Sequence, residues 1–302
     1  MHKDIVIILS AWRPEFLHMC FEHLVKCPEL SSKEIWLFED FKEGNEKFPE
    51  ELNETFKVVA HWKSILGPRM IQIMRPPNNY YGGSYNFLSA MNRAYKTDCE
   101  YVYEVEDDVL VSPDFFKFHT KVQNDGDYFC SVAGTFEKDS EGKPFPPEWK
   151  TNYNAYFKNP ACRTLGMCFK RENLGKVLEH YKPEYYTSDQ TMVDYMYANF
   201  RDSKYGIECV EYDGLISRVM EQDGRPAACS CAQRARHIGI WGYHRGIGLP
   251  NMIQGTLEYR IEQYKKLLND PEWLKKVAWF QTDVLDVPAP IEEVQEVYCI
   301  SE

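Results

Sequence analysis

The chain has 302 residues, of which 44% are hydrophobic and 27% charged, a composition that is ordinary for a globular enzyme. Its formal net charge of −11 argues against a protein that holds nucleic acid by bulk electrostatics, because phosphate binding requires clustered Lys and Arg. A local basic groove is still compatible with this charge.

No targeting or membrane segment is predicted. The apolar run near the N-terminus, Ile5 to Leu9, is too short for a signal sequence, and no stretch approaches the roughly 20 apolar residues of a membrane span. The 10 cysteines are scattered, and the closest pair, Cys229 and Cys231, lacks the spacing of a zinc or redox motif. We therefore expect a cytoplasmic protein, bacterial or encoded by a virus, with reduced thiols and no stable membrane insertion.

The first part of the chain alternates between strand and helix patterns. Helices are predicted to start at Pro14, at a cap formed by Ser84 and at a cap formed by Ser112. Between them, a β-branched apolar run at 4–9 predicts a buried strand, and three further strands are predicted at 34–40, 69–74 and 100–106. This alternation predicts an α/β fold with a mainly parallel central sheet flanked by helices.

From about residue 124 the pattern is less regular. A helix is predicted at 188–200, late helices at 256–268 and 271–280, and an acidic tail that frays after Val287. The segments 136–150 and 221–236 are predicted to be loops, which raises the question of whether they close over a ligand. Further strands are predicted at 125–134, 164–171, 206–212 and 214–220.

Three adjacent acids, Glu106, Asp107 and Asp108, follow the fourth predicted strand. Ligands of open α/β sheets bind beyond the carboxyl ends of the strands, and Asp40 ends the second strand at the same edge. Carboxylates suit hard cations such as Mg2+ and Mn2+, and a nucleoside diphosphate needs such a counter-charge. The alternative is a solvated acidic turn, which the strand before the acids and the helix start after them make less favourable.

Two other segments contain candidate residues. In the Gly-rich stretch 236–248, His237 could complete a metal site, and Arg236 or Arg245 could bind phosphate oxygens. The alternative is a structural turn that carries surface histidines, His237 and His244. Asp189 follows the expected cap Ser188 and is a candidate base, although a carboxylate in a first helical turn commonly serves only to stabilise the helix dipole.

Together these motifs resemble the GT-A class of nucleotide-sugar glycosyltransferases. The acid run followed by "VLVSPDFF" is similar to the N-acetylglucosaminyltransferase I branch. The opening "VIILSAWRPEF", the "LFED" of the second strand, "TSDQTMVDYM" and "RHIG" resemble further segments of the class. One departure is Ser188-Asp189, where the family usually places two acids, or an aromatic residue and an acid.

The resemblance implies a single GT-A (Rossmann-like) domain. Residues 1–123 would form its nucleotide-sugar-binding half, 124–250 the acceptor-binding and catalytic half, and 251–302 C-terminal helices and the tail. It also implies a transferase that uses Mn2+ or Mg2+ and a nucleotide diphosphate-sugar as the donor partner, with a UDP-sugar as the favoured donor. Asp108 and His237 would bind the metal, and Asp189 would be the catalytic base of an inverting reaction.

The resemblance assigns the donor-binding role to five residues, which are Arg13, Asp40, Glu106, Asp107 and Arg245. The acceptor is left open between a saccharide or other glycan and, for a phage-type enzyme, a hydroxymethylated DNA base.

Two other functions compete with this interpretation. A sugar-nucleotidyltransferase would carry a Gly-rich, Arg-containing loop after its first strand, and "SAWRPEF" at that place has no glycine. A non-catalytic carbohydrate- or Ca2+-binding module would need no nucleotide.

Overall fold

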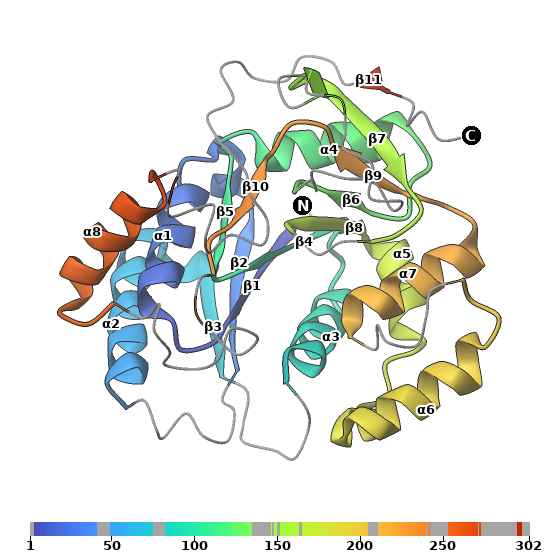
Figure 1. Cartoon of the computed structure of the whole chain (residues 1–302), viewed down its shortest axis with the longest axis horizontal. Coiled ribbons are helices and arrows are strands. Elements are labelled where there is room, and N and C mark those ends of the chain that lie inside the picture. Colours follow the sequence, from blue (N-terminus) through green and yellow to red (C-terminus); the bar gives the residue numbers. More distant parts are fainter. Residues whose placement is uncertain are drawn as a thin grey trace.

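A central sheet of nine strands organises the computed structural model (Figure 1). The model describes residues 3–40, 49–74, 82–134, 146, 148–149, 152–162, 165–204, 211–239, 241, 253–270, 272 and 295–297. The strands of the sheet are β1 (Ile5–Ser10), β2 (Glu34–Glu39), β3 (Met70–Met74), β4 (Tyr101–Glu106), β6 (Ser131–Val132), β7 (Ala155–Asn159), β8 (Met167–Lys170), β9 (Ala227–Ser230) and β11 (Gln295–Glu296).

The strand order is β11-β7-β9-β6-β8-β4-β1-β2-β3. Among these described strands, five of the eight neighbouring pairs are parallel and three are antiparallel. The predicted α/β class with a mainly parallel sheet is therefore confirmed. The four strands predicted in the first part of the chain are all present, and they form the continuous parallel portion β4-β1-β2-β3.

Helices cover both faces of this sheet because its strands are apolar on both sides. In β1, Ile5 and Ile7 belong to one buried cluster, and Val6 and Ile8 belong to another on the opposite face. The first cluster is covered by α3 (Gly82–Tyr95), α5 (Arg171–Leu178), α6 (Asp189–Phe200) and α7 (Tyr212–Asp223). The second is covered by α1 (Pro14–Leu24), α2 (Pro49–Leu66) and α4 (Phe115–Asp125).

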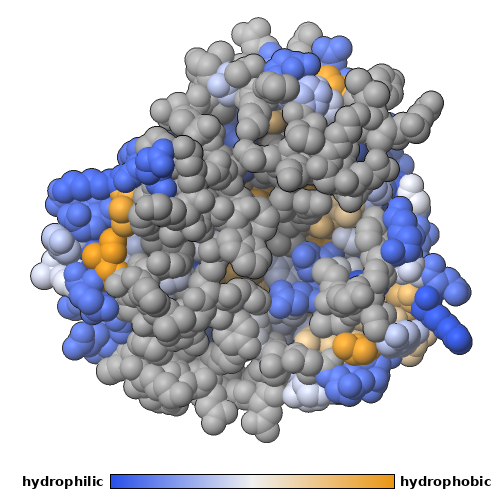
Figure 2. Space-filling model, in the orientation of Figure 1, coloured by the Kyte–Doolittle hydropathy of each residue, from blue (hydrophilic) through white to orange (hydrophobic). Residues whose placement is uncertain are grey.

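The predicted helix at 256–268 is present as α8 (Leu257–Leu267), with Thr256 accepting a hydrogen bond from the backbone N–H of Tyr259 as its cap. Tyr264 of α8 packs against Phe16 of α1 with ring centroids 5.2 Å apart. The opposite face of α8 is charged, and Figure 2 shows the hydrophilic surface that gathers over this helix. Tyr264 thus docks α8 onto α1, and Lys265 of α8 adds an ion pair with Glu22 of α1 at 2.6 Å.

Two predictions for the region after residue 210 are wrong. The segment 214–220, predicted to be a strand, lies within α7. Leu215, Ile216, Val219 and Met220 are buried on one side at helical spacing, and Gly224 ends the helix in the left-handed conformation with φ of 82°. A short apolar run does not distinguish the two structures, and here the helical spacing determines the outcome.

The segment 221–236, predicted to be a loop, contains β9 and part of β10 (Ala235–His237). β9 is made of Ala, Cys and Ser, which are small and give little strand signal, yet it is fully buried between β6 and β7. β10 pairs in antiparallel fashion with β5 (Val109–Val111) in a separate two-stranded sheet. Neither pairing can be seen in local sequence.

Two predicted caps are also wrong. α3 begins at Gly82, so Ser84 lies inside its first turn, where its hydroxyl accepts a hydrogen bond from the backbone N–H of Tyr212 at 3.1 Å. α4 begins at Phe115, and the Ser112 hydroxyl donates to Asp114 at 2.6 Å. The Ser188 cap is confirmed, because its hydroxyl accepts a hydrogen bond from the backbone N–H of Thr191 at 3.1 Å.

Several predictions fall wholly or mainly outside the described residues: the loop at 136–150, the strand at 206–212 and the helix at 271–280. The tail that was expected to fray contributes β11, which pairs with β7 in parallel. Within the described part of the chain, no helix is long and apolar enough to span a bilayer.

His119 of α4 generates a prediction about stability. It is fully buried, and its Nδ1 lies 2.7 Å from the Ser131 hydroxyl. Burial, together with the charges of Arg234 and Lys33, lowers the pKa of His119 to about 3. The folded state therefore favours the neutral ring, and this contribution is complete above about pH 6.5, the ordinary value of an unfolded histidine, and is lost as the pH falls toward 3.

We expect the free energy of unfolding to decrease by up to about 1.4 kcal/mol per pH unit in this window on account of His119 alone. His119→Asn retains a polar atom near Ser131 but cannot titrate, so its urea-derived stability should be less steep between pH 6.5 and 4 than that of the wild type. Equal slopes for the two proteins would contradict the assignment.

Candidate active site

The three acids lie at the carboxyl end of β4, beside the carboxyl ends of neighbouring parallel strands. β4 pairs with β1, which pairs with β2, so the chain segments that leave these strands meet at one edge of the sheet. The backbone N–H of Asp107 donates to the carbonyl of Leu9 at 2.8 Å, and that of Asp40 donates to the carbonyl of Ser10 at 2.8 Å. The structure therefore brings Asp40 and the acid run to the same edge, as ligand sites of such sheets require.

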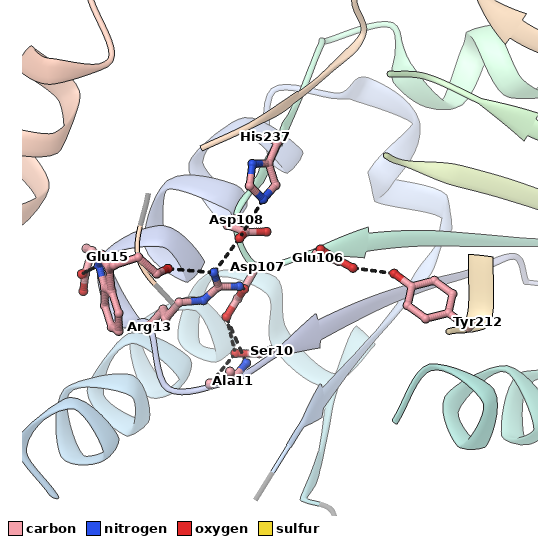
Figure 3. A network of polar contacts seen from close by, with 10 residues as sticks. Ser10, Ala11, Arg13, Glu15, Glu106, Asp107, Asp108, Tyr212 and His237 are labelled. Carbon is pink, nitrogen blue, oxygen red and sulfur yellow. Dashed lines mark hydrogen bonds and ion pairs between the residues drawn. The ribbon is translucent and has the colours of Figure 1, made fainter. Parts of the chain in front are cut away.

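Asp107 is directed toward the turn after β1 (Figure 3). Its Oδ2 accepts hydrogen bonds from the backbone N–H of Ala11 at 3.0 Å and from the Ser10 hydroxyl at 3.3 Å. The side chain is only 1% exposed. Burial raises the pKa of Asp107, and Arg13 opposes this effect.

Arg13 bridges two of the acids. One guanidinium nitrogen, Nη2, pairs with Oδ1 of Asp107, and the other, Nη1, lies 2.5 Å from Oδ2 of Asp108. Nη1 also donates to the carbonyl of Trp241 at 3.3 Å. Burial acts to lower the pKa of Arg13, but the two carboxylates outweigh it and raise the pKa above its ordinary value. The guanidinium is therefore a permanent positive charge that spans both carboxylates.

Asp108 also contacts His237, which the sequence analysis paired with it. β10 lies antiparallel to β5, so His237 faces Val109, and the backbone N–H of Ile238 donates to the carbonyl of Asp108 at 2.7 Å. His237 Nε2 is 3.2 Å from Oδ2 of Asp108. Although burial would raise the pKa of Asp108, Arg13 and His237 lower it, and the acid is held ionised.

The absence of a side chain at Gly239 leaves room for the Asp108 carboxylate. A Cβ at this position would lie 2.0 Å from Oδ2 of Asp108 and 3.0 Å from the His237 ring. Such a distance is far below van der Waals contact, so any side chain at residue 239 would displace the carboxylate. The glycine in "RHIG" is thus explained by the close approach of the backbone to the acid.

Asp108 and His237 could hold a divalent cation. Oδ1 of Asp108 is buried and has no hydrogen-bond partner among the described residues. Two adjacent ligands of an octahedral cation, each at about 2.1 Å, lie roughly 3 Å apart, which is close to the observed separation of 3.2 Å between Oδ2 and Nε2. No group of three or more His, Cys, Asp or Glu side chains in the described part of the chain has metal-site geometry. The residues therefore fit a cation that takes its remaining ligands from water or a substrate.

Glu106 faces the other way. Its Oε1 accepts a hydrogen bond of 2.5 Å from the hydroxyl of Tyr212 (Figure 3). Burial and the neighbouring Asp108 raise the pKa of Glu106 to about 7. Two residues earlier, Glu104 is fully buried, and burial followed by Glu106 and Asp108 raises its pKa well above the ordinary value.

The sequence analysis did not predict the contacts that Tyr212 and Trp241 make in this site. Tyr212 stacks on Phe87 of α3 with ring centroids 4.1 Å apart, which fixes its hydroxyl beside Glu106. The Trp241 indole donates to Glu15 at 2.9 Å, and this contact anchors the segment after β10 on α1. No local signal could have indicated either contact, because the partners lie 106 and 226 positions apart.

Four candidate residues are not placed in the site. Asp189 is the first residue of α6, but the position of its side chain lies outside what the structure describes, and His244 and Arg245 lie outside the described residues altogether. Arg236 is directed elsewhere, with its guanidinium donating to the carbonyl of Leu268 in α8 at 2.7 Å.

No protein-family model and no curated protein matches this sequence. Among solved structures, the chain is similar to the mannosyltransferase PcManGT of Pyrobaculum calidifontis in complex with GDP-Man and Mn2+, with a TM-score of 0.49 and 12% identity over 91% of this chain and 67% of that one. It is also similar to residues 1–349 of S. aureus TarS in complex with UDP-GlcNAc, with a TM-score of 0.48 and 12% identity over 89% of this chain and 67% of that one. Likeness at this level does not determine a function, which has to be inferred from the residues of the chain itself.

Gly239→Ala tests the close approach at Asp108. The added methyl group would displace the Asp108 carboxylate, so we expect Mn2+ binding, measured by calorimetry, to weaken at least about tenfold and the melting temperature to fall. Gly83→Ala in α3 is the matched control, because a Cβ there meets no atom within 4 Å. If the two variants bind Mn2+ equally well, Gly239 does not shape the site.

Proposed function

We propose that the chain is a metal-dependent glycosyltransferase of the GT-A class, which moves a sugar from a nucleoside diphosphate donor to an acceptor hydroxyl. The observation that carries the proposal is the buried acid run at the carboxyl ends of parallel strands, where Asp108 lies against His237 and Arg13. A purely structural turn would not need to bury two ionisable carboxylates side by side.

The donor would bind along this edge of the sheet. Asp40 would contact the base or ribose, and Glu106 and Asp107 would bind ribose and sugar hydroxyls. Arg13, with Arg245 as the second candidate, would contact the phosphates, since a guanidinium binds two oxygens at once. Asp108 and His237 would hold Mn2+ or Mg2+, which stabilises the negative charge of a departing diphosphate when bound.

The base of the proposed reaction is Asp189. It begins α6 after the confirmed cap Ser188, at a position where the helix dipole favours the ionised carboxylate. An ionised acid can take the proton from the acceptor hydroxyl as that oxygen attacks the anomeric carbon and the bond to the diphosphate breaks. This role corresponds to inversion at the anomeric carbon. The N-acetylglucosaminyltransferase I branch is the proposed closest group within the class.

We propose the same division of labour along the chain as the resemblance implied, with 1–123 binding the donor, 124–250 binding the acceptor and supplying the base, and 251–302 lying outside the reaction. A saccharide is the favoured acceptor and a hydroxymethylated DNA base the second, because the net charge of −11 disfavours a DNA substrate.

Fewer observations support the two alternative functions, a sugar-nucleotidyltransferase and a non-catalytic binding module. For a nucleotidyltransferase, the loop after β1 should be free to wrap a triphosphate, whereas here Ala11 and Arg13 are bound to the acids. A carbohydrate- or Ca2+-binding module would bind no nucleotide.

The proposal is tested by a panel of nucleotide sugars incubated with and without Mn2+, with hydrolysis of the donor as the readout. We expect turnover of one donor that depends on Mn2+, and loss of most of it in Asp108→Asn, because the variant exchanges a charged ligand for a neutral one of equal size. Asp202→Asn, at an exposed position, is the control. Absence of turnover with every donor, together with absence of nucleotide binding, would favour the non-catalytic module.

Asp189→Asn tests the base. The change retains the size of the side chain but removes its basicity, so transfer to an acceptor should fall by about 10²–10⁴ while donor and Mn2+ binding by calorimetry stay nearly unchanged. Asp194→Asn in the same helix is the control, because Asp194 is exposed and accepts only a local hydrogen bond from Gln190. Normal transfer by Asp189→Asn would mean that the base lies elsewhere or that the reaction retains configuration.

A further inference from the structure

Arg13 supplies positive charge to the acids that would otherwise attract a cation. Its guanidinium joins Asp107 and Asp108 through two separate nitrogens, one to each carboxylate. The side chain is 15% exposed, and its two partners are 1% and 4% exposed, so the charges interact in a largely dry environment. Charge-assisted hydrogen bonds of this kind are among the stronger polar interactions in proteins.

The same carboxylate oxygen serves two groups. Oδ2 of Asp108 is 2.5 Å from Arg13 Nη1 and 3.2 Å from His237 Nε2. A cation held between Oδ2 and Nε2 would bind the same oxygen that Arg13 contacts, and it would place a second positive charge against the guanidinium. The cation and Arg13 therefore repel each other at Asp108 in the observed arrangement.

The acid run also offers Arg13 a second position. Asp107 is held independently of Arg13, by the backbone N–H of Ala11 and the hydroxyl of Ser10. If the guanidinium leaves Asp108, it keeps its partner Asp107, and the nitrogen that is released stays at the edge of the sheet beside the acids.

We propose that Arg13 is an internal counter-ion that competes with the divalent cation for Asp108, so that cation binding transfers Arg13 from Asp108 to Asp107 alone. Arg13 thereby sets the affinity for the cation and is released toward the donor phosphates only when the cation is bound. The inference rests on the proposed function for the presence of the cation, and its test uses Mn2+ alone, without donor or acceptor.

The decisive comparison keeps the net charge of the site constant. In the double variant Arg13→Gln with Asp107→Asn, one positive and one negative charge are removed together, so the net charge beside Asp108 is unchanged while the direct contact of Arg13 with Asp108 is lost. We expect the Kd for Mn2+, measured by calorimetry, to be about tenfold to a hundredfold lower than in the wild type, as the loss of one charge-assisted contact implies. An unchanged or higher Kd would overturn the proposal.

The single variant Arg13→Gln should bind Mn2+ at least as tightly as the double variant does. Mn2+ should also raise the melting temperature of Arg13→Gln more than that of the wild type, because the cation replaces the missing counter-ion. Arg69→Gln is the control. It removes the same charge at the opposite edge of the sheet, where Arg69 donates only to the carbonyls of Leu30 and Lys33, and it should leave the Kd for Mn2+ within about twofold.

A measurement on the wild-type protein avoids the risk that a variant fails to fold. With labelled arginine, the guanidinium resonance of Arg13 should shift when the diamagnetic ion Mg2+ is added, and this shift should be absent in Asp108→Asn. A resonance that does not respond to a saturating cation would overturn the competition.

The results separate the inference from the proposed function. If the wild type and the charge-balanced variant bind Mn2+ equally, the competition is wrong, while Mn2+-dependent donor hydrolysis can still support the transferase. If the charge-balanced variant binds Mn2+ more tightly but no donor is hydrolysed, the competition stands and the proposed function fails. If neither protein binds Mn2+, there is no cation for Arg13 to compete with, and the inference is wrong.

Discussion

The salt bridge of Arg13 with Asp107 and Asp108 is the interaction on which the rest of the site depends. Two adjacent carboxylates that are almost fully buried cannot both remain ionised without a counter-charge, because the cost of removing each charge from water is several kcal/mol. Arg13 comes from the turn between β1 and α1, and it reaches both acids only because β1 lies next to β4 in parallel register. The pairing of the acids with Arg13 therefore depends on the strand order of the sheet.

The segment after β10, which contains Trp241, is held in place by packing against α1. The ring of Trp241 lies 5.5 Å from that of Trp12 and 5.7 Å from that of Phe16, and its indole donates to Glu15. These contacts attach the segment after β10 to the start of α1, and the ladder between β10 and β5 sets His237 beside Asp108. Glu106 and His237 are thus strand residues, whereas Asp107, Asp108 and Arg13 lie in short turns that directly adjoin strands or the start of α1.

The three acids differ because their neighbours differ. Arg13 and His237 together keep the pKa of Asp108 low, whereas Glu106 faces Tyr212 and has a pKa raised to about 7 by burial and by Asp108. One side of the run is consequently a fixed negative charge suited to a cation, and the other can exchange a proton near neutral pH. A site of this kind could bind a diphosphate through a cation held at its charged side and sugar hydroxyls through its neutral side, which is compatible with the proposed donor.

The sequence by itself determined the elements whose signal is local. The apolar run 4–9 predicted a buried strand, and its alternation with helices and three further strands predicted a parallel sheet, so the acids at the end of the fourth strand were placed at the ligand edge. The cap at Ser188 was equally readable, since it depends on a residue three positions later. Only the tertiary structure decided that 214–220 is helical, that β9 and β10 exist, and that Arg13 pairs with the acids. The two contacts of Arg13 with the acids span 94 and 95 positions and its contact with Trp241 spans 228, and pairing over such distances follows from the order of strands in the sheet, which no local periodicity contains.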